Sequence, residues 1–166
     1  MAGQIVNQAQ TATPGTPVTV LNVNTTSQDS SGSAETDIYT YSLPANTLNA
    51  NHKALRVVFV WRTATNSNNK VIKFYFGSSS TTVMSRTANN EHGTATFLIA
   101  RTASGAQVRF FETRYYNDST ASLGAQYGQL ATSAEADTGA ITVKITGQGV
   151  STGDVTGRMW VVEALN

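Results

Sequence analysis

The side chains that most often carry out chemistry in proteins are sparse in this sequence. It contains two histidines and no cysteine, so thiolate nucleophiles, thiolate metal sites and disulfides are all excluded. His52 and His92 stand in segments typical of turns, and neither has a second histidine or a carboxylate at the spacing of a metal site. We therefore interpret both histidines as turn residues and expect no metal ion and no cofactor.

The ten acidic residues are scattered along the chain. A glycosidase needs two carboxylates that face one another across a groove, and no pattern here pairs any two. Turn chemistry explains Asp154, which follows a glycine. Asp137 and Asp154 could also help to hold calcium in a loop, and this stays an alternative, although no EF-hand or Gly-Asp repeat supports it. Without a phosphate loop, a nucleophile elbow or a dinucleotide fingerprint, we expect no catalytic residue and no enzyme; an unrecognised glycan hydrolase is the remaining enzymatic alternative.

The charge of the chain argues against nucleic acid and membranes as partners. Arginines and aromatic residues alternate between Arg109 and Tyr116, as they do in proteins that bind single-stranded nucleic acid. A net charge of only +1 gives no general attraction to a polyanion. We therefore interpret this segment as a strand in which Phe110 and one of the two tyrosines, Tyr115 or Tyr116, pack inward. No apolar run is long enough for a membrane helix, and the N-terminus lacks the features of a signal peptide.

The apolar residues recur with the period of two that is typical of β-strands. Residues 54–63 show it most clearly, because Leu55, Val57, Phe59 and Trp61 fall on one face. The opposite face is mixed, so we expect something to cover its middle. A turn is predicted over 66–69, and the segment 71–76 after it is predicted to form a hairpin with the strand 54–63. Further strands are predicted at 18–23, 37–43, 81–87, 94–101, 106–116, 139–147 and 155–164, with a loop over 24–33 and a long loop or weak strand near Tyr127 over 117–138.

These eight to ten strands predict an all-β fold, an antiparallel β-sandwich of the jelly-roll type. We expect a single domain over residues 17–166, preceded by an extended N-terminal arm over residues 1–16, with Pro14 and Pro17 at their junction. This arm is either a frayed terminus or a segment that orders against a neighbouring subunit. In the second case Gln4, Ile5 and Val6 are its candidate contacts.

Several apolar residues fall on strand faces that point away from the predicted core. They are Val58, Val60, Leu98, Phe111 and either Met159 or Trp160. Soluble monomers avoid large exposed apolar patches, so we expect an oligomer or a docked partner, with Val58, Val60 and Phe111 as candidate partner contacts. The alternative is that bulges shift the register of these strands.

Three stretches of the sequence, taken together, resemble a known group of proteins. They are Ser42–Arg56, Asn68–Gly77 and Ile141–Gln148, and the closing stretch Val161–Asn166 fits the same pattern. Over about residues 35–166 the sequence resembles small virion proteins of tailed bacteriophages, especially phages of aquatic hosts. The resemblance carries no contact residue over to a particular position of this chain.

The resemblance implies a trimeric jelly roll on a virus particle. It implies a capsid decoration (cement) protein, made in the host cytoplasm, that binds the outer surface of the head and clamps neighbouring coat subunits. The partners are then a second and third copy of the chain and the major capsid protein. The alternative is a tail-fibre or head-fibre module that recognises host glycans, with Tyr115, Tyr116 and Tyr127 stacking on sugars. Because only residues 1–16 precede the domain, we expect decoration first.

Overall fold

The computed structural model describes residues 18–126, 128 and 131–165, which form twelve β-strands and no helix. The arm predicted over residues 1–16, with Gln4, Ile5 and Val6, lies outside the described residues, and so does Tyr127. In chain order the strands are β1 (Thr19–Asn24), β2 (Gln28–Ser31), β3 (Thr36–Leu43), β4 (Ala54–Thr63), β5 (Asn69–Phe76), β6 (Ser79–Thr87), β7 (Glu91–Ala103), β8 (Ala106–Asn117), β9 (Ser122–Gln126), β10 (Ala131–Ser133), β11 (Ile141–Gln148) and β12 (Thr152–Leu165). Every predicted strand is present, with ends that differ by at most three residues.

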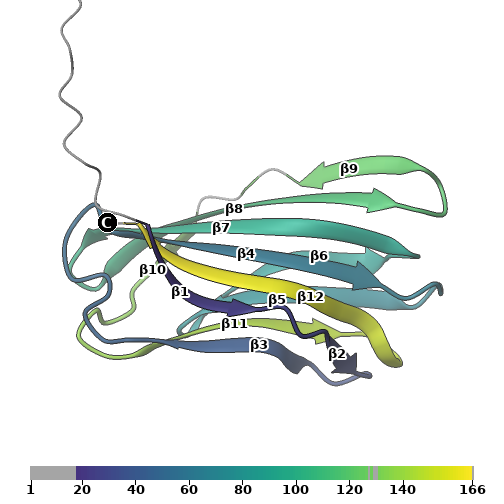
Figure 1. The fold of residues 1–166 in the computed structure, drawn as a ribbon, viewed down its shortest axis with the longest axis horizontal. Helices are drawn as coiled ribbons and strands as arrows, with labels where there is room; N and C mark the ends of the chain where they lie inside the picture. The colour runs from purple at the N-terminus through teal and green to yellow at the C-terminus, as the bar shows by residue number, and fades with distance from the viewer. Residues whose placement is uncertain (1–17, 127, 129–130, 166) are drawn as a thin grey trace, which may run out of the picture.

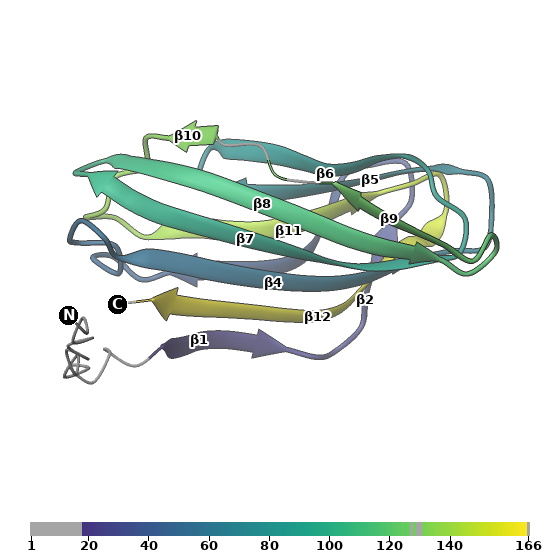
Figure 2. The ribbon, with the colours of Figure 1, turned by 90° about the horizontal axis from the view of Figure 1, so that it is seen from above.

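The strands form two antiparallel sheets that pack face to face (Figure 1). The larger sheet has the order β1-β12-β4-β7-β8-β10, with β2 beside β12 and β9 beside β8, and Figure 2 shows β1, β12, β4, β7 and β8 as one layer. The smaller sheet has the order β3-β11-β5-β6. The facing quartets β1-β12-β4-β7 and β3-β11-β5-β6 have the strand order of a jelly roll, and β8 to β10 extend the larger sheet beyond it. The predicted antiparallel sandwich is confirmed.

The core lies between the two sheets, and β4 supplies its centre. Leu55, Val57, Phe59 and Trp61 are at most 1% exposed, which confirms the face predicted from their period of two. The sheets meet in an aromatic stack, because the ring centroids of Phe74 on β5 and Phe97 on β7 are 4.0 Å apart. Burial of these large side chains is the main favourable term that holds the sheets together.

The predicted hairpin between residues 54–63 and 71–76 is wrong. β4 pairs with β12 and β7 in the larger sheet, whereas β5 pairs with β11 and β6 in the smaller one. The short connection after Thr63 therefore crosses from one sheet to the other. A hairpin turn and a sandwich corner use the same turn residues, so the local sequence does not separate them.

Strand β8 presents to the core the opposite face from the one predicted. Phe111 is 4% exposed and its ring centroid lies 5.9 Å from that of Phe97, whereas Phe110 is 42% exposed. The inner face of β8 also carries the polar residues Gln107, Arg109 and Thr113, all buried. These polar side chains hide the period of two in the sequence, which is why Phe110 was predicted to pack inward and Phe111 to contact a partner.

A β-bulge in β12 decides which of its large residues is buried. Gly157 pairs with Trp61 and Met159 pairs with Val60, so Arg158 is the extra residue between them. The bulge places Arg158 and Met159 on the outer side in succession and returns Trp160 to the core, where it is fully buried. The sequence left open whether Met159 or Trp160 faces away from the core. In the structure Met159 faces outward and Trp160 is a core residue. Strand β2 was predicted as loop, because its polar residues carry no apolar alternation. Strands β9 and β10 lie in the stretch 117–138, which the sequence left as a long loop or a weak strand.

Gly157 tests how closely the sheets approach beside this bulge. A Cβ atom on Gly157 would lie 2.5 Å from Cγ2 of Ile38 and 2.7 Å from a ring carbon of Tyr39. We expect Gly157→Ala to lower the free energy of unfolding by about 1–3 kcal/mol through overpacking, measured by urea denaturation. Gly139→Ala is the matched control, since nothing lies closer than 3.9 Å to its new Cβ. Equal stability of the two variants would contradict the close packing.

Candidate interaction surface

The outer face of the larger sheet carries a band of apolar side chains. Strand pairing aligns Val23, Val161 and Val58 in one row across β1, β12 and β4. A parallel row includes Val20, Leu98 and Phe110, with the charged pair Glu163 and Arg56 between them. We call this band the apolar face, and its members are Val20, Val23, Val58, Val60, Leu98, Phe110, Met159 and Val161.

The apolar face is open to solvent in the single chain. Val20 and Val23 are each 55% exposed, Phe110 is 42% exposed and Leu98 is 39% exposed. Val58 and Val60 lie deeper and are half-buried by their neighbours. Val23 lies beside Val161 and Leu98 lies beside Phe110, so exposed apolar side chains are grouped on this side of the sheet, as they are at interaction sites.

Charged residues of both signs flank the apolar face and pair with one another. Nε of Arg56 and the Glu163 carboxylate are 2.5 Å apart, and the guanidinium of Arg114 lies 4.0 Å from the Glu112 carboxylate. Such exposed pairs contribute little to the stability of one chain. They do, however, offer both signs of charge to whatever covers the face.

Two hollows interrupt the apolar face. One has a volume of about 350 Å³ and is lined mainly by Leu98, Phe110 and Leu165. The other has a volume of about 230 Å³ and lies between Val60, Tyr116 and the strongly exposed Leu123. Apolar hollows of this size accept single side chains of a partner better than they accept a drug-sized ligand.

The outer face of the smaller sheet is polar and satisfies itself. Lys73, Tyr75 and Thr146 all donate hydrogen bonds to the Glu35 carboxylate, and Lys144 donates to Asp37 at 2.8 Å. Burial alone would raise the pKa of Glu35, but the hydrogen bonds from Lys73, Tyr75 and Thr146 outweigh it and lower the pKa to about 2. The two outer faces therefore differ: the larger sheet exposes apolar side chains, and the smaller one exposes polar side chains that bind one another.

Two of the predicted contact residues, Val58 and Val60, lie on this face, and their contact with a partner stays a prediction. Leu98 and Met159, which were predicted to point away from the core, also lie there, whereas Phe111 and Trp160 lie in the core. Val20, Val23, Phe110 and Val161 were missed. Their outward direction depends on which strand each one pairs with, and the sequence does not state those pairings.

The two histidines differ from one another in the structure. His52 is an exposed turn residue with φ +73°, as predicted. His92, in contrast, is the second residue of β7, so its prediction as a turn residue is wrong. Its Nδ1 lies 3.5 Å from the Asp118 carboxylate and its ring packs 5.5 Å from Tyr116. The pair is exposed and sits beside the smaller hollow of the apolar face.

Asp154 closes one end of the sandwich. Its fully buried carboxylate accepts hydrogen bonds from the backbone N–H groups of Val150 and Ser151 and from the side-chain amides of Asn66 and Asn68. Burial alone would raise its pKa, but these four donors outweigh burial and hold the pKa well below the ordinary value of 3.8. The carboxylate thereby ties the β4–β5 connection to the β11–β12 connection.

Lys70 stabilises the same end of the sandwich by binding the β4–β5 connection from its buried side. Its ammonium is fully buried and donates to the backbone oxygens of Asn66 and Asn68 at 2.9 and 3.0 Å and to Oδ1 of Asn66 at 2.6 Å. Burial lowers the pKa of Lys70, and the nearby charges of Asp154 and Glu91 oppose that shift. All three ammonium donors are therefore used within the fold.

Asp137 performs the corresponding task at the other end of β4. It accepts hydrogen bonds from Arg101 at 2.7 Å, from the Gly105 backbone at 3.1 Å and from Gln107 at 3.0 Å. Arg101 is linked to Lys53 before β4, whereas Asp154 is linked to Ala64 after it. The two aspartates thus lie at opposite ends of the strand, and a shared calcium loop is excluded. Within residues 18–126, 128 and 131–165, no three His, Asp or Glu side chains gather as metal ligands do.

The comparisons with known proteins give only loose likenesses. No protein-family model matches the chain, and no curated protein matches it in sequence. Arcelin-5, a lectin-like defence protein of Phaseolus vulgaris, is 7% identical, with a TM-score of 0.41 over 89% of this chain and 91% of that one. The CBM2 module of the evolved Dit of Lactobacillus casei BL23 phage J-1 is 10% identical, with a TM-score of 0.36 over 75% of this chain and 67% of that one.

The VP2 subviral particle of infectious bursal disease virus is 12% identical, with a TM-score of 0.38 over 92% of this chain and 34% of that one. This chain therefore spans about a third of the viral protein's length. At these TM-scores the likenesses carry no argument about function. The strand order and the two unlike outer faces define the molecule as a jelly-roll domain with one largely apolar outer face, and no helix in the part described is able to cross a membrane.

Asp154 makes the stability of the domain depend on pH. We expect Asp154→Asn to lower the free energy of unfolding by about 3 kcal/mol at neutral pH, because the amide cannot accept all four hydrogen bonds. A carboxylate with a lowered folded-state pKa stabilises the fold above its unfolded value, and that contribution is lost as the pH falls through the folded value. The difference between wild type and variant should therefore shrink below about pH 4 in urea titrations.

Asp118→Asn is the matched control for this experiment. Asp118 is exposed, and among the described residues its charge contact is the 3.5 Å approach to His92, so we expect the free energy of unfolding to change by no more than about 0.5 kcal/mol. If the difference in the free energy of unfolding between Asp154→Asn and wild type stays constant from neutral to acid pH, the role given to the buried carboxylate is contradicted.

Proposed function

We propose that this chain is a structural protein of a tailed-bacteriophage virion, a decoration (cement) protein that binds the outer surface of the capsid as a homotrimer and clamps neighbouring coat subunits. The observation that carries the proposal is the contrast between the apolar outer face of the larger sheet and the self-paired polar outer face of the smaller one. A domain with one such face gains free energy when a second protein surface covers it. The sequence resemblance to small virion proteins supplies the setting.

A second copy of the chain is the occupant that fits the apolar face best. The face presents Arg56 and Arg114 together with Glu163 and Glu112, so another copy brings a charge of opposite sign for each. Apolar rows such as Val23, Val161 and Val58 then pack as a core divided between subunits. This arrangement leaves the polar face and the ends of the sandwich for other contacts.

Trimer formation would also multiply the contacts with the capsid. Once one subunit of a trimer is bound, the other two meet their sites at a high effective concentration, so modest single contacts give firm attachment. A net charge of +1 leaves neighbouring trimers without strong mutual repulsion. The proposed action is binding alone: Asp137 and Asp154, its most buried carboxylates, accept hydrogen bonds that close the fold.

The glycan-binding fibre module is the second candidate, and the hollow beside Tyr116 is the observation in its favour. The half-buried Tyr116 and the exposed His92 form an aromatic pair there. Tyr115 is less suited to stacking on sugars, because the Arg86 guanidinium lies 3.8 Å above its ring and the ring packs against the core. A specific signal on a glycan array that Tyr116→Ala abolishes would favour this candidate over decoration.

The oligomeric state tests the use of the apolar face. Leu98→Glu places a carboxylate directly opposite Arg56, which the single chain tolerates, but charges the middle of the apolar face. We expect wild type to run as a trimer in light scattering at micromolar concentration and Leu98→Glu to run as a folded monomer. Thr142→Glu, exposed on the polar face, is the control and should remain trimeric. A monomeric wild type would exclude the apolar face as a subunit interface.

Copy number in the virion tests the decoration role itself. In purified particles of the phage that encodes the chain, we expect its amount to approach that of the major capsid protein, by quantitative mass spectrometry. Added to capsids that lack it, the protein should raise their melting temperature, because it binds the assembled shell and not the dissociated coat. A ratio of a few per cent would place the protein at the tail or a single vertex, and failure to bind shells would rule out decoration.

A further inference from the structure

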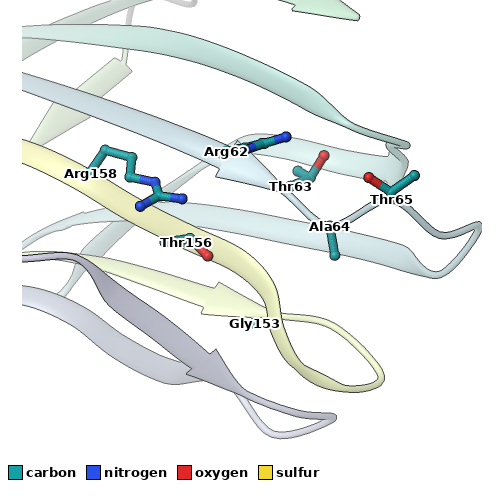
Figure 3. A pocket seen from close by; sticks show the side chains of 7 residues that line it. All are labelled: Arg62, Thr63, Ala64, Thr65, Gly153, Thr156 and Arg158. Carbon is teal, nitrogen blue, oxygen red and sulfur yellow. The ribbon is translucent and has the colours of Figure 1, made fainter. Parts of the chain in front are cut away.

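A small pocket lies at the end of the larger sheet where β4 ends and β12 begins (Figure 3). Its volume is about 190 Å³, and Arg62 on β4 and Arg158 on β12 both line it, with Thr156 between them. Pairing in the sheet sets Thr156 directly opposite Arg62, and the bulge after Gly157 adds Arg158 on the same outer side. Two residues nearly a hundred positions apart in the sequence are thereby brought to one site.

Neither guanidinium has a carboxylate partner among the described residues. The arginines at positions 56, 86, 101 and 114 all form ion pairs, whereas Arg62 and Arg158 are exposed and form none. Arg62 donates one hydrogen bond to Oδ1 of Asn90 at 2.9 Å, and Arg158 donates one to Oγ of Ser27 at 3.0 Å. A guanidinium has five N–H donors, so each arginine keeps most of its donors for a ligand.

The hydrogen bonds to Asn90 and Ser27 also hold the two side chains in place. An arginine that is already positioned loses less conformational entropy when a ligand binds. The wall behind the pocket is firm too, because the backbone N–H of Ala64 donates to the Asp154 carbonyl at 3.1 Å beside the buried closure of the sandwich. Each arginine at the pocket is thus restrained by one hydrogen bond, against a backbone wall that is itself fixed.

We propose that this pocket binds a carboxylate group presented by a partner protein. Guanidinium groups bind planar carboxylates through paired N–H donors. The size favours a single terminal group, since 190 Å³ is below the range of pockets for whole small molecules. The charge favours a monoanion: Thr156 donates to the carboxylate of Asp29 at 2.5 Å, and this nearby negative charge offsets one of the two arginines.

The site goes beyond the proposed virion role and does not depend on it. Arg62 and Arg158 lie on the same outer side as Val60 and Met159, so the pocket marks one end of the apolar face. A protein surface that covers the apolar face would carry its acidic group to this end. The pocket then fixes the position of the partner along the strands, which apolar packing alone leaves loosely defined.

The test is a titration of the isolated, isotope-labelled protein with sodium acetate, followed by two-dimensional NMR. We expect saturable shifts of the backbone N–H signals of Thr65, Gly153 and Thr156, with a Kd on the order of 10 mM, and no saturation with sodium chloride at equal ionic strength. Arg62→Gln or Arg158→Gln should weaken acetate binding about tenfold. Arg114→Gln, at an exposed arginine outside the pocket, should leave it unchanged.

Asp29→Asn separates the site from a general loss of structure. The amide oxygen still accepts the hydrogen bond from Thr156, but the repelling charge is gone, so acetate should bind about threefold more tightly. Identical shifts in acetate and chloride, or unchanged binding in the double variant of Arg62 and Arg158, would overturn the proposal. Saturation by phosphate without saturation by acetate would overturn the assignment of a carboxylate. None of these outcomes depends on whether the protein binds capsids.

Discussion

The packing of the inner face of β4 against the smaller sheet is the interaction on which the rest of the structure depends. The strand lies near the middle of the larger sheet, and its inner residues from Leu55 to Trp61 are excluded from water. Once they face inward, the period of two obliges Arg56, Val58, Val60 and Arg62 to face outward. The apolar face and the arginine pocket are therefore the reverse side of the core, and a one-residue slip of β4 would lose all three together.

The two ends of β4 are fixed by buried polar groups. Asp154 and Lys70 close the end after Thr63, and Asp137 with Arg101 closes the end before Ala54. Each of these charges is almost completely removed from water and is tolerated because hydrogen bonds satisfy it. Asp154 does serve its own turn, as the sequence predicted, because it accepts hydrogen bonds from Val150 and Ser151. It also binds Asn66 and Asn68 of another connection, and Asp137 likewise holds connections of the sandwich. By fixing both ends of β4, these polar groups hold in place the outer surface that lies between the two ends.

Strand positions could be predicted from the sequence far better than strand partners. The alternation in 54–63 and 141–147 follows directly from side-chain burial, so both strands were located correctly. The partner of 71–76 was not, because the turn residues at 66–69 suit a hairpin and a crossing between sheets equally. In β8 the inner face mixes Gln107, Arg109 and Thr113 with Phe111, so a prediction based on apolar period chose the wrong phenylalanine.

The candidate surface could be anticipated only in part, for the same reason. Val58 and Val60 were found because the other face of their own strand was so clearly apolar. The arginine pocket could not be found, since it requires that Thr156 pair with Arg62 and that a bulge add Arg158. Neither the pairing nor the bulge leaves a local signal in the sequence. The outward residues of a single strand could thus be predicted, whereas a site formed by two paired strands could not.

The position of β12 has a consequence for how the protein is made. This strand lies between β1 and β4 and also holds β2, although it follows all three in the chain. While the chain emerges from the ribosome, the edge of β4 that β12 covers stays unpaired until Thr152–Leu165 has followed, and pairings over such long sequence separations form slowly. The nascent chain thus carries an open edge on a strongly apolar strand while residues 64–151 are made. Closing of the larger sheet and protection of this edge from aggregation both wait for β12.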